Sequence, residues 1–430
     1  MSIFRKLRRA LRGEVSPRTA VWETVRRSNA AMRKKRERRD LPKQANGAAR
    51  LTPGFSNLST AALLEHFQQR NEPHFFPGFD PSQATDTSSS TFGEEASAVF
   101  ASADQITNEH CWPLFGNLNH QFIDWHRDPL SGYDWPLDFY GDIQLHRNDG
   151  SDVRVIWELN RLGHLLTLAR AYSLNNDRRF SAEFFRQVES WDSRNPFGHG
   201  VNWNCAMEVA LRAINLLGAF AVFRRAPDFD DDKLVQLLRI FDQHGRFIRE
   251  HLEFSYIATS NHYLSNIAGL LWLGIMLPEL AGAAAWKSFG LRELLREMDK
   301  QILPDGADYE SSTGYHRLVL EMFCYSFVLC RLNGVAIEER YWQKLHRMFN
   351  YLRACLRPDG YAPLLGDTDS GRVFPISHRR GDDHGYLLAL GAVLFDDAQL
   401  KDDKLPIPPE LLWLLGDEGV AKYQTLTVNN

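Results

Sequence analysis

Residues 260–277 read SNHYLSNIAGLLWLGIML, a polar opening followed by a run that is almost wholly apolar. Ser260 or Asn261 suits the N-cap of a helix, because a short polar side chain can accept a hydrogen bond from a free backbone N–H of the first turn. A helix that is apolar nearly all round must be covered by its neighbours. The segment therefore predicts an inner helix of a helical protein, although capping does not explain His262.

The helical pattern extends on both sides of this segment. From about residue 155 to residue 356, apolar side chains recur at steps of three and four residues, which is typical of helices with a buried face. Turn sequences rich in Pro, Asn, Asp and Gly separate the helices. The predicted helices span residues 156–172, 205–223, 234–254, 262–277, 291–302, 316–332 and 341–356. Because successive helices with short connections pack antiparallel, we predict an all-α protein, either a layered bundle or a closed ring of hairpins.

The composition fits a folded chain with a separate basic arm. Of the 430 residues, 44% are hydrophobic and 24% are charged, which excludes a disordered chain. Residues 1–50 hold 16 Lys and Arg against 4 Asp and Glu, which leaves 34 against 50 in the rest of the chain. The arm is either a solvated helix or a segment attracted to an anionic surface, such as a membrane, a nucleic acid or an acidic polysaccharide.

The shifts in pattern divide the chain into segments. We predict a basic arm over 1–50, an irregular lead-in with short helices over 51–109, the main helical domain over 110–372 and a tail over 373–430. The tail loses the helical periodicity except for a short apolar helix near 386–395. No stretch reaches the roughly 18 apolar residues that a membrane span needs, and no secretion signal is recognisable at the start. A cytoplasmic protein is therefore expected.

Charged residues inside the apolar helices mark candidate functional positions. Glu158 and Arg161 are three residues apart, and Glu208 and Arg212 are four apart, so the members of each pair can lie on one helical face. Each pair is either a structural ion pair or a direct contact to a sugar or a carboxylate.

Two further polar runs stand out. YESSTGYHR at residues 309–317 opens another apolar helix, and capping explains one of its hydroxyl residues but not the adjacent Tyr315 and His316. GDTDSGR at residues 366–372 is interpreted as a tight turn closed by Asp side chains, because the further ligands of a calcium loop are missing. The five cysteines show no metal-binding spacing either. We therefore predict no metal site.

Five stretches together resemble the heparinase II/III family of polysaccharide lyases and its alginate-lyase relatives. In the family's order they are VIWELNRLGHLLTLARAY (155–172), GVNWNCAMEVALRAINLL (200–217), SNHYLSNIAGLLWLGIMLPEL (260–280), DGADYESSTGYHRLVLEMF (305–323) and PLLGDTDSGR (363–372). The resemblance implies an incomplete α/α toroid of antiparallel helical hairpins, followed by an antiparallel β-sandwich, with the active site between them. Since only 58 residues follow Arg372, we expect the toroid with the β-sandwich missing.

The resemblance also implies catalytic roles. In β-elimination a base removes the C5 proton of a uronic acid, and hydrogen bonds or positive charge must offset the negative charge that develops beside the carboxylate. The resemblance gives Asn261 this neutralising role, with His262 close to it, and makes Tyr315 the base, the acid or both. A phenol needs a cationic or hydrogen-bonding neighbour to ionise, for which His316 or Arg317 is available.

The spacing of the two main catalytic candidates is compatible with one site. Asn261 and Tyr315 lie 54 positions apart, each at the start of a helix, and helices two apart in a ring of hairpins run in the same direction. Both helix starts can therefore face one mouth. The family's remaining catalytic His or Tyr comes from the β-sandwich and finds no counterpart here. The predicted substrate contacts are Trp157, Glu158, Arg161, Asn202, Trp203, Glu208, Arg212, His316 and Arg317.

We therefore predict a polysaccharide lyase that cleaves a uronic-acid-containing glycan by β-elimination without a cofactor, and whose partner is an acidic polysaccharide rather than a nucleic acid. A non-catalytic or truncated toroid that binds glycan is the first alternative. The second is an α/α-toroid glycoside hydrolase, which needs an acid and a base carboxylate facing one cleft. Asp305, Asp308 and Glu310 are the candidates for that chemistry.

Overall fold

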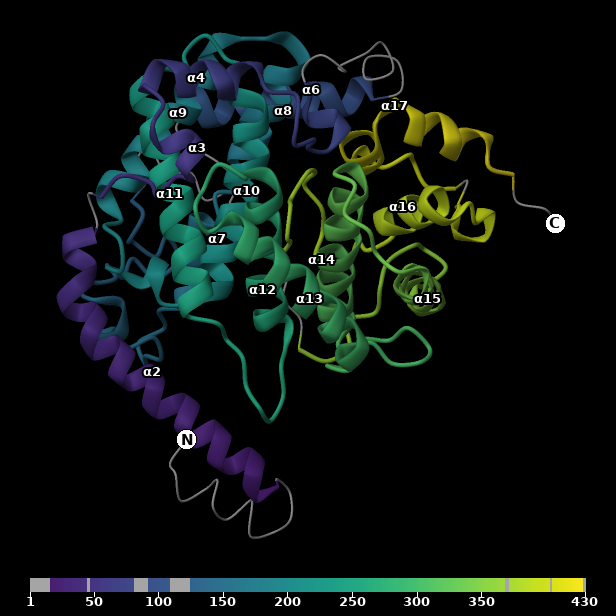
Figure 1. The fold of residues 1–430 in the computed structure, drawn as a ribbon. Coiled ribbons are helices and arrows are strands. Elements are labelled where there is room, and N and C mark those ends of the chain that lie inside the picture. The colour runs from purple at the N-terminus through teal and green to yellow at the C-terminus, as the bar shows by residue number, and fades with distance from the viewer. Residues whose placement is uncertain are drawn as a thin grey trace.

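The computed structural model describes residues 16–44, 47–80, 92–108, 124–367, 371–402 and 404–427. These residues are mostly helical, and they contain isolated β-bridges but no β-strand (Figure 1). The prediction of an all-α protein is confirmed for the part of the chain that the structure describes.

The helices follow one another in a simple order. The first are α2 (Pro17–Gln44), α3 (Pro53–Ser56), α4 (Thr60–Gln69) and α6 (Gly93–Asn108). The main body contains α7 (Val153–Asn160), α8 (Leu165–Asn175), α9 (Arg178–Arg194), α10 (Ala206–Phe223), α11 (Asp231–Glu250), α12 (Asn261–Met276), α13 (Ala283–Gln301), α14 (Thr313–Leu332) and α15 (Glu339–Cys355). The last are α16 (Tyr386–Phe395) and α17 (Pro409–Thr425), and short 3-10 helices include η1 (Pro77–Phe79) and η4 (Val201–Trp203).

The helices of the body form an inner and an outer layer. The inner helices α10, α12 and α14 are buried along almost their whole length, whereas α11, α13 and α15 bury one face and expose the other. α8 packs on α10, α10 on α12 and α12 on α14, and each also packs on the helix that follows it in sequence. This alternation of inner and outer helices is an incomplete α/α toroid of antiparallel hairpins, as predicted.

α10 and α12 form the centre of the core. A side chain at Gly269 of α12 would place its Cβ 2.8 Å from the Cβ of Ala210 in α10, so the two helices approach too closely for any larger residue. Among the described helices, α10 alone is long and apolar enough to cross a membrane, and 94% of that stretch is buried inside the fold. Such burial is typical of a core helix, which agrees with the prediction of no membrane span.

The segment predicted as a tail packs on the toroid. α16 coincides with the short apolar helix predicted there and lies on α15, whereas the sequence pattern indicates no helix at α17. The guanidinium of Arg170 in α8 lies 5.1 Å from the ring of Trp413 in α17, and the Tyr386 hydroxyl of α16 donates to Glu321 in α14. The described residues after 371 are therefore held firmly on the toroid. The exact boundaries of the four segments stay predictions.

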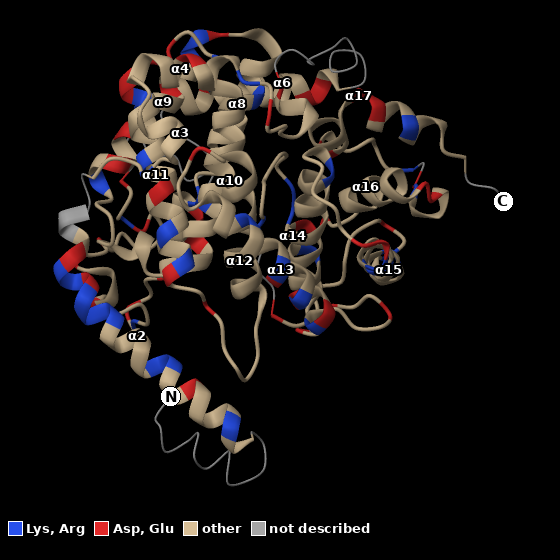
Figure 2. Cartoon of the chain, viewed as in Figure 1, with Lys and Arg blue, Asp and Glu red and all other residues tan. Residues whose placement is uncertain are grey.

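α2 is a single basic helix on the outside of the molecule (Figure 2). Near its C-terminal end its contacts with the body are polar. The Glu37 carboxylate accepts a hydrogen bond from the Tyr140 hydroxyl at 2.6 Å and lies 3.0 Å from His251 Nε2. The side of α2 that carries Glu37 is therefore fixed to the body, although much of the helix surface stays exposed.

Candidate active site

Two neighbouring inner helices, α12 and α14, begin beside each other. Tyr309, in the loop before α14, donates its hydroxyl hydrogen to the backbone carbonyl of Thr259, just before α12. Ser312 caps α14, since its hydroxyl oxygen accepts from the backbone N–H of Tyr315 at 3.2 Å. The two helix starts therefore open on one region of the molecule.

Asn261 is held by a carboxylate from the same loop. Its side-chain Nδ2 lies 3.0 and 3.2 Å from the two carboxylate oxygens of Glu310, and its backbone N–H donates to Glu310 at 2.8 Å. The N-cap residue Ser260 makes no side-chain capping bond, so Glu310 caps α12 from outside the helix. Asn261 is 4% exposed, and its amide is bound to a carboxylate from the neighbouring hairpin; its predicted neutralising role stays a prediction.

His262 lies on the exposed side of the same turn and pairs with Glu253. Its Nδ1 is 3.0 Å from Glu253 Oε1. Desolvation by itself would lower the pKa of His262, but the hydrogen bond and charge of Glu253, together with the charges of Glu208 and Glu310, raise it. The imidazole next to Asn261 therefore keeps a positive charge to higher pH than a free imidazole does.

Cys205 completes this cluster. Its sulfur lies 3.6 and 3.7 Å from the carboxylate oxygens of Glu253 and 3.9 Å from His262 Nδ1. Among the described residues, only these three offer ligand atoms within 4.8 Å of one another, so they could hold a metal ion. Burial, and then the charges of Glu253 and Glu208, raises the pKa of the Cys205 thiol well above its ordinary value. A metal ion would have to displace that proton, whereas the three groups as they stand already satisfy one another as hydrogen-bonding partners.

Tyr315 is half-buried at the start of α14. Its hydroxyl donates to Asp367 Oδ2 at 3.1 Å, and the Asp367 backbone carbonyl in turn accepts from the Ser312 hydroxyl at 2.5 Å. Asp367 belongs to the predicted turn, of which residues 368–370 lie outside the described residues. The phenol therefore meets a carboxylate from this turn, and that carboxylate fixes its direction.

His316 and Arg317 serve the interior instead, which corrects their predicted roles. His316 Nε2 lies 3.1 Å from the backbone oxygen of Met348, and burial lowers the pKa of His316 to about 4. Arg317 is 1% exposed and donates to Glu321 at 3.0 Å and to the Gly371 carbonyl at 2.6 Å. A neutral buried imidazole and a paired buried guanidinium hold the start of α14 in place, and neither is exposed to a substrate.

The predicted pair of Glu158 and Arg161 forms, and Arg161 also binds Glu208 near the candidate site. Arg161 binds Glu158 at 2.5 Å, as predicted, and also binds both carboxylate oxygens of Glu208 at 2.7 and 2.9 Å. Glu208 contributes to the electrostatic environment of Cys205 and His262. Glu158 is partly exposed and the other two are buried. These three residues thus extend the polar cluster towards α7.

The predicted pairing of Glu208 with Arg212 is wrong. Arg212 is 0% exposed, and it donates to His244 Nε2 and to the Asn202 carbonyl, both at 2.9 Å. Its guanidinium also lies over the ring of Trp203, and burial lowers its pKa to about 9. Asn202 and Trp203 are as deeply buried as Arg212, so all three are core residues rather than substrate contacts. Their role is to join η4 to α10.

Trp157 occupies an intermediate position. It is partly buried, and its indole N–H donates to the backbone carbonyl of Val201 at 2.9 Å. One edge of the ring is therefore fixed to η4. The structure leaves the prediction that this ring contacts a sugar open.

The sequence pattern indicates no role for Glu253, and it offers Glu310 only as a candidate hydrolase residue. Glu310 lies five residues before Tyr315 in the same polar run, and this position could have indicated that it belongs to the site. Glu253 carries no comparable signal, because its contact with His262 depends on the loop between α11 and α12. The third carboxylate of this region, Asp308, is buried, and burial together with the charge of Glu310 raises its pKa to about 7.

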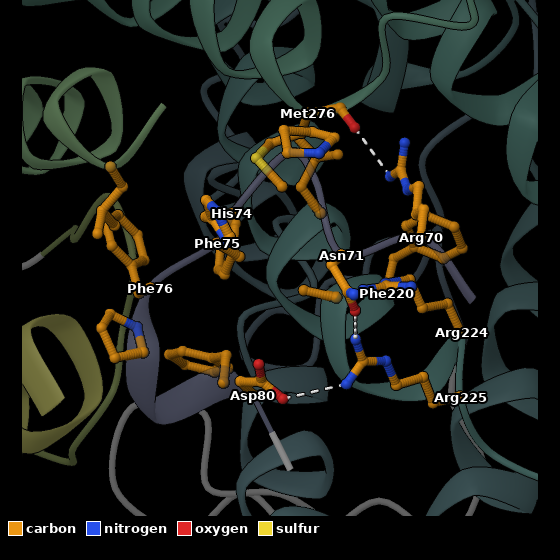
Figure 3. A pocket seen from close by; sticks show the side chains of 16 residues that line it. Arg70, Asn71, His74, Phe75, Phe76, Asp80, Phe220, Arg224, Arg225 and Met276 are labelled. Carbon is orange, nitrogen blue, oxygen red and sulfur yellow. Dashed lines mark hydrogen bonds and ion pairs between the residues drawn. The ribbon is translucent and has the colours of Figure 1, made fainter. Parts of the chain in front are cut away.

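A separate hollow of about 290 Å³ lies at the opposite end of α12 (Figure 3). Arg70 donates there to the backbone carbonyl of Met276, the last residue of α12, and Arg225 contacts Asp80 and Asn71. None of the predicted site residues lines this hollow. The candidate active site is therefore the polar cluster at the starts of α12 and α14.

The fold and this cluster define a helical toroid domain with a polar mouth. Residues 48–376 match the family described as Heparinase II/III N-terminus, and the chain belongs to this family. It is 26% identical over 258 residues to a heparin-sulfate lyase from Pedobacter heparinus, which covers 58% of this chain and 38% of that relative. It is 24% identical over 259 residues to a heparin-sulfate lyase from Bacteroides stercoris, with 55% and 38% coverage.

Solved structures give the same result for the fold. A crystal structure of heparinase III superposes with a TM-score of 0.57 at 18% identity, and covers 80% of this chain and 50% of that one. A heparan sulfate lyase, HepC from Pedobacter heparinus, superposes with a TM-score of 0.54 at 21% identity, with 79% and 49% coverage. The chain thus spans 38% of the length of the curated relatives named above and about half of these two structures.

Proposed function

We propose that this chain is a polysaccharide lyase that cleaves a uronic-acid-containing glycosaminoglycan, of the heparan sulfate type, by β-elimination. The observation that carries the proposal is the Asn261 amide, which already binds a carboxylate at 3.0 Å and lies beside the imidazole of His262. A uronate that replaces or joins the Glu310 carboxylate at this amide receives a hydrogen bond and a neighbouring positive charge. Both stabilise the negative charge that develops when the C5 proton leaves.

Tyr315 supplies the proton transfer in this proposal. Tyr315 first passes its phenolic hydrogen to the Asp367 carboxylate that accepts from it, the resulting phenolate takes the C5 proton as the C5–H bond breaks, and Asp367 returns its hydrogen to Tyr315 at the end of the cycle. The electron pair forms the C4–C5 double bond, the bond from C4 to O4 breaks, and O4 receives a proton from Tyr315. The products are a 4,5-unsaturated uronate and a shortened chain, and no cofactor takes part.

Product formation tests the proposal directly. Incubation of the full chain with heparan sulfate, and separately with alginate, should produce the ultraviolet absorbance of a 4,5-unsaturated uronate. Tyr315→Phe and Asn261→Ala should each abolish it, while circular dichroism and gel filtration show an unchanged fold. Elimination that continues in either variant contradicts the assigned roles.

A glycan-binding toroid without activity is the second candidate. It is favoured by the burial of Asn261, which is 4% exposed and whose amide is already bound to Glu310. Affinity for heparan sulfate without any unsaturated product supports this alternative. A hydrolase is distinguished by the release of reducing ends without the ultraviolet absorbance, and it requires Glu310 for catalysis.

A further inference from the structure

The helix α2 and the loop that leads into α12 enclose a hollow of about 610 Å³ beside the candidate active site. On the α2 side it is lined at helical spacing by Trp22, Val25, Arg26, Asn29, Ala30, Arg33 and Arg36. On the other side it is lined by Arg249, Glu250, Leu252, Phe254, Tyr256, Tyr263, Phe289 and Glu293. Leu252 and Phe254 of the second wall flank Glu253, which pairs with His262, so this wall leads into the candidate active site.

The position of α2 is fixed by specific contacts. Besides the Glu37 contacts described above, Arg38 pairs with Asp142, and Arg33 donates to the backbone carbonyl of Glu250. Near the other end of α2, the ring of Trp22 lies 5.8 Å from that of Tyr256. The hollow is thus a gap between two surfaces held together at both ends.

The charges in the hollow favour an anion. Four arginines line it, Arg26, Arg33, Arg36 and Arg249, against the two glutamates Glu250 and Glu293, whereas the chain beyond residue 50 has an excess of acidic residues. Arg36 is exposed and makes no hydrogen bond or ion pair with another residue that the structure describes. Arg249 stacks on Phe289 at 4.4 Å and pairs with no described carboxylate. Two guanidinium groups are therefore available to sulfate or carboxylate groups.

The aromatic side chains in the hollow suit sugar rings. Trp22 is 49% exposed and Tyr256 is 45% exposed, although each is large and apolar enough to be buried. Phe254 supports Tyr256 edge-on at 4.9 Å. Exposed rings next to guanidinium groups provide stacking for a sugar face together with hydrogen bonds for its charged substituents.

We propose that α2 and the loop at residues 251–260 form a subsite for an acidic oligosaccharide, continuous with the candidate active site. α2 lies outside the residues that match the family, 48–376, so this subsite is an addition to the shared toroid. The inference rests on the proposed function, in which the substrate is a polyanion. The subsite supplies the cationic surface that such a substrate needs on an otherwise acidic chain.

The test compares two neighbouring positions on one helix. Arg36 lines the hollow, whereas Lys35 is exposed on α2 but does not line it, so Arg36→Ala and Lys35→Ala remove the same charge from nearly the same place. Binding of a heparan sulfate hexasaccharide is measured by calorimetry in the full chain carrying Tyr315→Phe, so that no substrate is consumed. Arg36→Ala should weaken binding about five- to tenfold, as expected for a charge-assisted hydrogen bond, and Lys35→Ala about twofold or less.

Trp22→Ala provides an independent arm, since it removes a stacking surface without changing the charge. It should weaken hexasaccharide binding by a similar factor. Equal losses in Arg36→Ala and Lys35→Ala, or no loss in Trp22→Ala, overturn the subsite in favour of general attraction to a basic helix.

Two further probes exclude other anionic partners. Arg36-dependent binding to phosphatidylserine vesicles or to duplex DNA, without Arg36-dependent binding to the hexasaccharide, overturns the inference. The test remains separate from the lyase proposal because it measures binding alone. If no unsaturated product ever forms but the Arg36 and Trp22 effects appear, the subsite stands and the lyase proposal fails.

Discussion

The contact between Glu310 and Asn261 gives the sharpest prediction. Glu310→Gln keeps a side-chain oxygen that can accept from the Asn261 backbone N–H, but it removes the negative charge that lies against the amide. In the lyase proposal this charge repels the substrate carboxylate that binds the same amide. We therefore expect Glu310→Gln to bind the uronate substrate more tightly and to retain elimination.

The magnitude follows from the geometry. Two carboxylates that accept from one amide nitrogen at about 3 Å each place their nearest oxygens about 5 Å apart. Their repulsion is about 1 kcal/mol in water-like surroundings and about 3 kcal/mol at an effective dielectric constant of about 20. Because Glu310 is only partly buried, the lower value applies, and KM should fall about fivefold with kcat within about threefold.

The assay is steady-state formation of the unsaturated uronate. Glu65→Gln is the matched control, because it makes the same change at an exposed residue of α4. This helix lies near the end of α12 opposite the candidate site, where Arg70 donates to the Met276 carbonyl. This control should leave KM unchanged. Loss of all activity in Glu310→Gln refutes the reasoning and favours Glu310 as a catalytic carboxylate, as in the hydrolase alternative. An unchanged KM shows that the substrate does not meet Asn261.

Three further predictions concern the surroundings of the site. Elimination should decline as the pH rises through the raised pKa of His262. Glu253→Gln should move this decline to lower pH, because only the charges of Glu208 and Glu310 then oppose the lowering of the pKa by desolvation; a decline at the same pH in both proteins excludes His262 as the titrating group. Arg212→Ala should lower the free energy of unfolding by more than about 2 kcal/mol in urea denaturation, because it leaves buried acceptors unpaired. The control, a substitution at the surface residue Arg178, should lower it by less than about 0.5 kcal/mol. A chelator should leave product formation unchanged, because Cys205, Glu253 and His262 already bind one another; inactivation that added zinc reverses would identify them as a metal site.

The sequence predicted the helices well, because their information is local. The apolar run at 260–277 corresponds to α12, and the short apolar stretch at 386–395 corresponds to α16. α17 escaped detection because Gly416, at φ +69°, interrupts it and its hydrophobic pattern is weak. Periodicity over a few turns therefore located most helices of the body, but it missed the continuous helix α9 and joined α7 and α8, which residues 161–164 separate, into one helix.

The site was less predictable, because its contacts join residues distant in sequence. The spacing of Glu208 and Arg212 permits an ion pair, yet Glu208 binds Arg161 from another helix at 2.7 Å. A helical spacing shows which groups can meet but not which competing partner is closer. In the same way, the contact of Glu253 with His262 exists only once the loop between α11 and α12 has folded.

The external cap on α12 has a consequence for how the protein gains and loses activity. Asn261 and its carboxylate partner Glu310 come from different hairpins, so the amide is oriented only while those hairpins stay docked. Mild heating or low denaturant that separates them should inactivate the protein before circular dichroism registers any loss of helix. Maturation during synthesis is likewise delayed until the later hairpin has emerged and joined the earlier one.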